Sequence, residues 1–320
     1  FWRSPSAARE LLAFNRHLRE QGFDLVLDIQ GLFRSAWFAR ATRAPVRVGF
    51  ANAREMAWLF YTHRVDVGTP EQHAIERYRK LLSAIGCPDG PVEFPFPVTE
   101  VDRAAARQLV SKGGEYAVLC PGANWLTKRW PTRYFAQLVP ELQKRFGLRS
   151  VVAGGPGDSE LAAQIPGALN LCGKTTLMQL VALMERARLV ITNDSGPMHI
   201  AAALGRPLVA VFGPTNPVRT GPYGRPECVV RANIDCMPCY RRQCSHRSCL
   251  EKLAIEPVLI TRAGRPAAII RGTKLAIPWT TPSTLTCNCQ AHLSAGMSQL
   301  LPPISTPALL NSRSTCSNTL

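Results

Sequence analysis

The feature that most constrains the fold is the stretch from Leu189 to Gly224, LVITNDSGPMHIAAALGRPLVAVFGPTNPVRTGPYG. Its pattern predicts a buried strand over 188–192, a helix over 198–204 that ends at Gly205, and a second buried strand over 208–212. A strand, a tight turn, a helix and another strand form the repeating unit of a parallel sheet. The chain therefore belongs to the α/β class.

The turn between that strand and helix, Asn193 to Pro197, is a candidate ligand site. Asp194 or Ser195 can cap the helix, and Gly196 allows close approach to the backbone. The first N–H groups of a helix attract anions, so they suit a diphosphate, while Asp194 suits sugar hydroxyls. A plain capping turn is the alternative. His199 and the Gly213-Pro214 loop after the next strand favour the ligand site, because ligands bind at the carboxyl ends of parallel strands.

The remainder of the chain repeats the same pattern in two halves. A proline-rich segment over 90–101 reads as a linker. We expect a first domain over 1–98, a second over 99–257, and an atypical, disordered tail over 258–320 without any acidic residue. In the first half we expect helices over 4–21, 33–41 and 71–85 and strands over 24–29 and 46–49. In the second half we expect helices over 102–112, 158–165 and 176–187 and strands over 116–120, 150–153 and 169–172.

The second half contains further candidate donor-binding residues. Thr127 and Lys128 follow a strand in a loop of small residues, an arrangement that suits phosphate. Asp158 or Glu160 suits ribose hydroxyls, although carboxylates at a helix start are also common caps. The segment Gly154-Gly155-Pro156-Gly157 departs from the dinucleotide fingerprint, which disfavours a nicotinamide enzyme. Gly173-Lys174-Thr175 is not a P-loop, because Ala168 stands where the first glycine is required.

The first half offers residues for an acidic acceptor. Gln30, Arg34, His73 and Arg77 are candidates, since arginine binds carboxylate and phosphate oxygens in pairs. Solvated helix positions are the alternative for both arginines. The net charge of +16 also indicates an anionic partner, but nucleic-acid-binding motifs and a membrane-spanning stretch are absent from the sequence.

Four of the eleven cysteines form a compact group, Cys236, Cys239, Cys244 and Cys249, with His246 between them. The spacing C-x2-C-x4-C-x4-C is compatible with zinc or, less regularly, with an iron–sulfur cluster. The chemistry expected below requires no metal, so we assign none to the active site. Single cysteines such as Cys120 and Cys172 are expected in the core.

The motifs resemble a known family. Asn193 to His199 (NDSGPMH), then Gly205-Arg206-Pro207 and Phe212 to Thr215 (FGPT), resemble the signature of glycosyltransferase family 9, the ADP-heptose heptosyltransferases of lipopolysaccharide synthesis. Residues 28–35 (DIQGLFRS) and 72–77 (QHAIER) are similar to the acceptor side of the type I enzymes. The resemblance covers about residues 5 to 257.

The resemblance implies the glycosyltransferase-B fold, with two Rossmann-like domains that face each other across a cleft. The second domain would bind ADP-L-glycero-D-manno-heptose through Thr127, Lys128, Asp158, Glu160, Lys174, Thr175, Asp194, Ser195, Gly196, Pro197 and His199. The first would bind Kdo-lipid A through Gln30, Arg34, His73 and Arg77. Lys174 and Thr175 would lie near the adenosine.

The reaction implied is an inverting, metal-independent heptose transfer without a cofactor. The family places its general base in a Gly-Asp turn that we expect in an N-terminal segment before Phe1, and Asp28 is a poor substitute because it lies within a strand. We expect a cytoplasmic protein with peripheral contact with the inner membrane and no nucleic-acid partner. Two alternatives stay open: a family 9 transferase with another sugar or acceptor, and a non-catalytic nucleotide-sugar-binding fragment.

Overall fold

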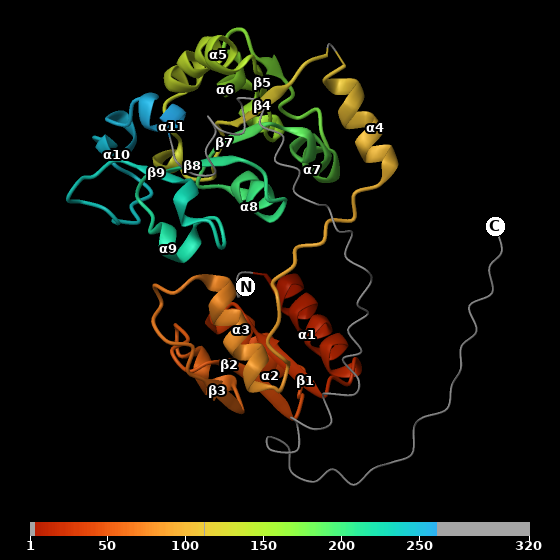
Figure 1. Ribbon diagram of the computed structural model, residues 1–320. Helices are drawn as coiled ribbons and strands as arrows, with labels where there is room; N and C mark the ends of the chain where they lie inside the picture. The colour runs from red at the N-terminus through yellow and green to blue at the C-terminus, as the bar shows by residue number, and fades with distance from the viewer. Residues whose placement is uncertain (1–3, 112, 261–320) are drawn as a thin grey trace, which may run out of the picture. The chain divides into compact units, whose positions relative to one another are not determined.

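The computed structural model describes residues 4–111 and 113–260, which form two compact units (Figure 1). The first consists of residues 4–67 and 77–90, and the second of residues 68–76 and 91–260. Each unit has its own parallel sheet, so the α/β prediction is confirmed. The disordered tail was predicted over residues 258–320, and residues 261–320 lie outside the described residues. Residues 258–260 belong to the last described helix, α11 (Glu256–Ile260).

The first unit contains a three-stranded sheet with the order β1-β2-β3. The parallel register aligns Leu25 with Val46 and Val48 with His63. β3 was not predicted, since three residues with two polar side chains give little strand signal. The elements are α1 (Pro5–Glu20), β1 (Leu25–Asp28), α2 (Phe33–Ala41), β2 (Val46–Phe50), the 3-10 helix η1 (Ala57–Phe60), β3 (His63–Val65) and α3 (Ala74–Ala84), which starts in residues of the second unit.

The start and end of α1 follow from its sequence. The hydroxyl of Ser4 accepts a hydrogen bond from the N–H of Ser6 (3.3 Å), and Pro5 stands at the first helical position. Gly22 follows the helix with φ +61°, a backbone conformation that glycine adopts without strain. The helix predicted over 4–21 is therefore confirmed.

The second unit contains a six-stranded parallel sheet with the order β6-β5-β4-β7-β8-β9. The chain moves outward in one direction from β4 and in the other from β7, so the switch point lies between these two central strands (Figure 1). β9 was not predicted. The strands are β4 (Tyr116–Cys120), β5 (Arg149–Val152), β6 (Leu169–Asn170), β7 (Leu189–Asn193), β8 (Leu208–Phe212) and β9 (Val229–Arg231).

Helices cover both faces of this sheet, which explains why Ala117, Val118 and Leu119 are all fully buried. Helices α4, α7 and α8 contribute to one apolar cluster, and α5, α6, α10 and α11 contribute to the other. The helices are α4 (Glu100–Leu109), η2 (Leu126–Lys128), α5 (Thr132–Phe146), η3 (Pro156–Asp158), α6 (Ser159–Ala163), α7 (Leu177–Arg186), α8 (Gly196–Ala203), α9 (Pro217–Thr220), η4 (Pro226–Cys228), α10 (Ser248–Glu251) and α11 (Glu256–Ile260).

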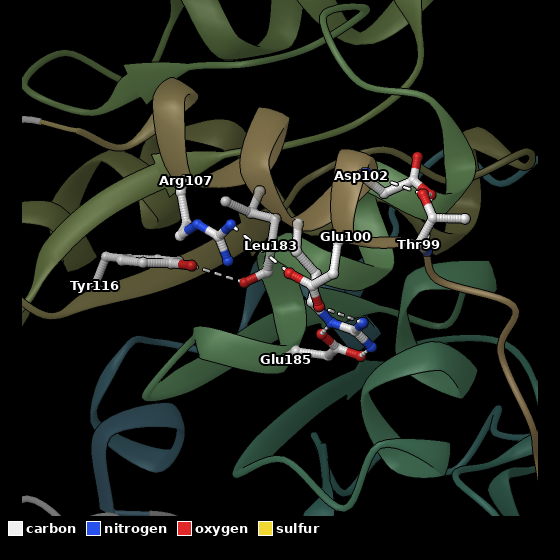
Figure 2. Close-up of polar contacts among 8 residues, drawn as sticks. Thr99, Glu100, Asp102, Arg107, Tyr116, Leu183 and Glu185 are labelled. Atoms are coloured by element: carbon white, nitrogen blue, oxygen red, sulfur yellow. Dashed lines mark hydrogen bonds and ion pairs between the residues drawn. The ribbon is translucent and has the colours of Figure 1, made fainter.

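Polar contacts fix α4 against α7 (Figure 2). The guanidinium of Arg103 donates to both carboxylate oxygens of Glu185, at 2.9 and 3.1 Å. α4 begins two residues earlier than predicted, because Thr99 and Asp102 form a reciprocal capping pair. The hydroxyl of Tyr116 donates to the carbonyl of Leu183 (2.8 Å), which ties α7 to β4.

Residues 68–76 belong to the second unit although they precede the linker. The side-chain amide of Asn216 donates to Glu71 (2.6 Å), and Nε2 of His73 lies 3.1 Å from the carbonyl oxygen of Gly221. Both contacts join this segment to the chain that follows β8. In the described part of the protein, none of the helices combines the length and apolar character needed to cross a membrane.

Candidate functional site

A cavity of about 530 Å³ lies at the carboxyl ends of the central strands of the second unit. Its wall includes Asp158, Thr175, Ser195 and Pro197, which were predicted from the sequence as donor-binding residues. These residues come from the segments that follow β5, β6 and β7. The cavity thus lies at the switch point, where ligands bind in open parallel sheets.

Asp194 joins three loops beside this cavity. Its carboxylate oxygen Oδ2 lies 2.7 Å from Nζ of Lys128, in the loop after β4. The same oxygen accepts a hydrogen bond from the hydroxyl of Thr215 (2.5 Å), in the loop after β8. The Asp194 side chain is only 5 % exposed. A buried carboxylate needs such partners, because removal of an ionised group from water is costly.

Aromatic contacts orient the ammonium group of Lys128. Nζ lies 4.8 Å from the ring centroid of Trp125, and Cζ of Arg242 lies at the same distance from that ring. Cations bind the electron-rich faces of aromatic rings, so Trp125 restricts where Lys128 can point. Lys128 and Asp194, each predicted to face the donor, therefore lie against each other.

Thr127 was predicted to contact phosphate. Its side chain is 3 % exposed, and its hydroxyl donates to the carbonyl of Arg241 (2.8 Å). It lines a different cavity, formed by the cysteine-rich loop, and does not line the cavity at the switch point. The geometry thus assigns Thr127 a role in holding the loop that carries Lys128.

The turn before α8 leaves the start of that helix open. Ser195 is the N-cap residue, as expected, but its hydroxyl lies 3.3 Å from the carbonyl of Asn193, and no described side chain caps the helix. A Cβ atom added to Gly196 would meet nothing within 4 Å. The helix N-terminus beside the cavity can therefore accept an anionic group.

His199 lies in the second turn of α8 and is crowded by charged groups. Removal from water lowers the pKa of His199; the Asp194 carboxylate acts in the opposite direction, and His73 and Lys128 lower it further. His199 is therefore predominantly neutral at pH 7. His73, predicted for the acceptor, packs 5.1 Å from the ring centroid of Tyr223.

Asp158 fits tightly between two glycine-containing loops. Its carboxylate accepts a hydrogen bond from the N–H of Gly155 (3.0 Å). A Cβ atom at Gly122 would lie 2.4 Å from this carboxylate, and one at Gly154 would lie 2.5 Å from it. Both glycines are therefore required for Asp158 to lie in the cavity wall. Glu160 and Lys174 are exposed and are not among the residues that line the cavity.

Comparison with known proteins assigns the family. The model of glycosyltransferase family 9 (heptosyltransferase) matches residues 11–250. The chain belongs to glycosyltransferase family 9. Lipopolysaccharide heptosyltransferase 1 of Pseudomonas aeruginosa is 31 % identical over 243 residues, which are 73 % of this chain and 66 % of that protein. Lipopolysaccharide heptosyltransferase 2 of Escherichia coli K12 is 32 % identical over 237 residues, 67 % of this chain and 66 % of that protein.

Solved structures of heptosyltransferases are similar to this family 9 chain. The E. coli ADP-heptose lipopolysaccharide heptosyltransferase II has a TM-score of 0.60 and 28 % identity, with coverage of 80 % of this chain and 79 % of that one. E. coli heptosyltransferase WaaC with ADP-2-deoxy-2-fluoro heptose has a TM-score of 0.56 and 29 % identity, with coverage of 72 % and 73 %. The predicted glycosyltransferase-B fold class is confirmed by this likeness.

The predicted acceptor residues of this family 9 chain lie in both units. Gln30 and Arg34 are exposed in the first unit, Gln30 in the turn between β1 and α2 and Arg34 in the first turn of α2. The guanidinium carbon of Arg77 lies 4.4 Å from the ring centroid of Phe50, in the same unit. His73 belongs to the second unit.

Asp28 is occupied by the fold of the first unit. Its carboxylate accepts hydrogen bonds from the N–H groups of Gln30 (2.9 Å) and Gly31 (3.0 Å) and from the hydroxyls of Ser35 (2.8 Å) and Tyr61 (2.7 Å). Burial, followed by the bond to Asp28 and its charge, raises the pKa of Tyr61. The network ties the Asp28 carboxylate to the fold of the first unit, and its unsuitability as a general base stays a prediction.

The bonding roles of two residues in the family 9 motifs were not predicted. Thr215 lies in the FGPT motif, but sequence alone does not indicate that it bonds Asp194. Asn193 is fully buried; its amide accepts from the N–H of Trp130 (3.0 Å) and donates to the carbonyl of Pro121 (2.7 Å). The sequence signal for Asn193 was a polar amide at the end of a largely apolar strand, because a buried amide needs hydrogen-bond partners.

Proposed function

We propose that this chain transfers heptose from ADP-L-glycero-D-manno-heptose to the Kdo-lipid A inner core in lipopolysaccharide synthesis. The observation that carries the proposal is the Lys128–Asp194–Thr215 group beside the open N-terminus of α8. It combines a cation, a carboxylate and the backbone N–H groups near Ser195 and Gly196 at the switch point of a parallel sheet. These are the groups that a diphosphate-linked sugar requires.

The donor would bind with its diphosphate at Gly196 and Lys128. Phosphate oxygens attract the Lys128 ammonium, which then shares its charge between the phosphates and Asp194. The Asp194 carboxylate would accept hydrogen bonds from heptose hydroxyls. Asp158, held in the cavity wall by the two glycine loops, would accept hydrogen bonds from the ribose hydroxyls. Thr175 lines the same cavity on the adenosine side.

In the transfer step, an acceptor hydroxyl oxygen forms a bond to the anomeric carbon from the face opposite the diphosphate. The bond between that carbon and the phosphate oxygen breaks, ADP leaves with the electron pair, and the configuration inverts. Lys128 and the N–H groups near Ser195 and Gly196 stabilise the charge that develops on the leaving diphosphate. A carboxylate must take the acceptor proton. Asp28 is unsuitable, because four donors already occupy its oxygens.

An anionic acceptor suits the basic residues of the chain. Arg34 is exposed at the start of α2, and Kdo supplies carboxylates that a guanidinium binds in pairs. Heptosyltransferases 1 and 2 match this chain at similar identity, so overall identity does not separate the two types. The assignment to type I therefore depends on the resemblance of segments 28–35 and 72–77 to the type I enzymes. Peripheral contact with the cytoplasmic face of the inner membrane would follow from a lipid-anchored acceptor.

The first experiment is calorimetry with ADP-heptose on the chain and on Lys128→Ala and Asp194→Ala. We expect each variant to lose about 1–3 kcal/mol of binding free energy, because a charge-assisted contact is removed. Lys144→Ala is the matched control, because Lys144 is exposed on α5, away from the cavity. Folded protein that does not bind ADP-heptose would contradict the proposal.

Donor and acceptor profiling separates the alternatives. Preference for another ADP-sugar, or transfer to an acceptor other than Kdo-lipid A, would indicate a family 9 transferase of different specificity. Tight ADP-heptose binding without transfer would indicate a nucleotide-sugar-binding fragment.

A further inference from the structure

The cysteine-rich loop of the second unit encloses a separate cavity. Cys236, Cys239, Cys244 and Cys249 all line one cavity of about 230 Å³. Cys249 is buried, Cys239 and Cys244 are half-buried, and Cys236 is exposed. All four are free thiols. Four thiols from one short segment therefore surround a common space.

The cysteine-rich loop is long and lacks regular secondary structure. Residues 232–247 contain neither helix nor strand, and loops beyond about 12–15 residues without secondary structure are uncommon. Ile234 and Met237 pack against the apolar core, whereas Arg241, Arg242 and other loop residues are exposed. A crosslink within the loop would offset the entropy of ordering it.

The charge of the cavity suits a metal thiolate centre. Four thiolates around a divalent ion carry an excess of about two negative charges. Arg241, His246 and Arg247 line the same cavity, and Arg247 also pairs with Glu251 at 3.0 Å. The positive charge of the two guanidinium groups offsets the negative charge of such a centre.

We propose that these four cysteines bind one structural zinc ion. Zinc takes four thiolates in a tetrahedral arrangement, and the Cys-x2-Cys spacing is typical of its structural sites. Among the described residues, no three metal-ligating side chains are already placed to hold an ion. Binding therefore requires the thiols to turn into the cavity that they line.

The zinc ion would not touch the donor, but it would stabilise the loop that bonds Pro214 and Thr127, which are the neighbours of Thr215 and Lys128. The N–H groups of Cys239 and Tyr240 donate to the carbonyl of Pro214, at 3.0 and 2.9 Å. The carbonyl of Arg241 accepts the hydroxyl of Thr127 (2.8 Å). These bonds connect the cysteine loop to the residues next to Thr215 and Lys128. A clamped loop would thus keep the partners of Asp194 in place.

Metal analysis of the purified chain tests this proposal. The protein is expressed with zinc and iron both supplied, purified under reducing conditions without chelator, and analysed by mass spectrometry for metals. We expect about one zinc ion per chain, which a mercurial thiol reagent releases. We also expect cobalt(II) added to the stripped protein to give the visible absorption of a tetrahedral thiolate site.

Variants identify the ligands. Cys239→Ser and Cys244→Ser should lose most of the zinc and the cobalt absorption, while Cys87→Ser, a half-buried thiol in the first unit, should retain both. Cys236→Ser is the safest variant, because this side chain is exposed and its replacement leaves the core intact.

Three outcomes would overturn the proposal: wild-type chain that binds neither zinc nor cobalt, iron with acid-labile sulfide in place of zinc, or disulfides among the four cysteines in the reduced preparation. Zinc content unchanged in Cys236→Ser and Cys244→Ser would also exclude the site. Because metal content is measured without a sugar nucleotide, this test is independent of the proposed transferase activity.

Discussion

Asp28 and Asp194 occupy similar places in the two units but have different partners. Asp28 ends β1 and Asp194 directly follows β7, and each is 5 % exposed. Asp28 accepts four hydrogen bonds from neutral donors of its own unit. Asp194 is paired with the ammonium of Lys128 and the hydroxyl of Thr215.

The difference indicates which carboxylate is available to a ligand. The donors around Asp28 belong to its own turn, to α2 and to a buried tyrosine, so none can leave without disruption of the unit. The ammonium of Lys128 is at the end of a flexible side chain and can be shared with a phosphate. A buried carboxylate with a mobile partner is therefore suited to binding, whereas one with fixed partners is suited to stability.

The largest effect is expected for Lys128→Ala. Loss of the ammonium removes stabilisation of the leaving diphosphate and leaves Asp194 without its cation, so transfer should fall by roughly 10²–10³-fold. Single-turnover transfer rates measure this effect, with Lys144→Ala as control. A double variant with Asp194→Asn should lose less than the sum of the two single losses, because the residues are in contact. Additive losses would show that the pair does not act as a unit.

Asp28→Ala tests the other side of the comparison. Four buried or half-buried donors would lose their acceptor, and we expect the first unit to unfold more easily by about 3 kcal/mol. Thermal unfolding followed by circular dichroism measures the change, and Asp28→Asn, which keeps an acceptor oxygen, should lose less. ADP-heptose affinity should not change, since Asp28 lies outside the donor cavity. A stable Asp28→Ala chain with weakened donor binding would reverse the two roles.

Gly122→Ala extends the comparison to Asp158. The added Cβ would lie 2.4 Å from the carboxylate and must displace it, so we expect ADP-heptose binding to weaken by about 1–2 kcal/mol. Gly157→Ala is the matched control, because its Cβ would meet nothing within 4 Å. Calorimetry compares the two variants. Equal affinities would show that Asp158 does not contact the donor.

The smallest effect concerns His199. Its pKa is lower in the folded chain than the ordinary value of 6.5. Its contribution to stability is therefore fully present above about pH 6.5 and is lost as the pH falls through the folded-state pKa, because the unfolded chain then binds the proton more readily. Unfolding measured from pH 7.5 downward should show a weaker decrease for His199→Gln. An unchanged pH profile would show that burial does not lower the pKa of His199.

Local pattern predicted the centre of the fold well. Strands and helix expected over 188–192, 198–204 and 208–212 are observed as β7, α8 and β8, with bounds that differ by at most two residues. Apolar strands and a Gly-bounded helix give strong signals, whereas β3 and β9, with three residues each, give almost none. The spacing of the four cysteines indicated a candidate metal site, but it could not show that they line one cavity.

The pairing of site residues was beyond the sequence. Lys128 and Asp194 were each predicted to face the donor, and their contact depends on β4 lying beside β7 in a register that aligns Cys120 with Thr192. Sequence likewise gave no reason to place the hydroxyl of Thr127 on the carbonyl of Arg241. Such contacts depend on which strands become neighbours, and this is a property of the whole sheet.

Asn193 has a consequence for the energetics of donor binding. Through one amide it joins the end of β7 to both sides of the loop that carries Lys128, at Pro121 and at Trp130. The backbone segments that carry Lys128 and Asp194 are thereby joined before any donor arrives. Less backbone entropy then has to be lost on binding, so more of the attraction between diphosphate and ammonium is retained as affinity.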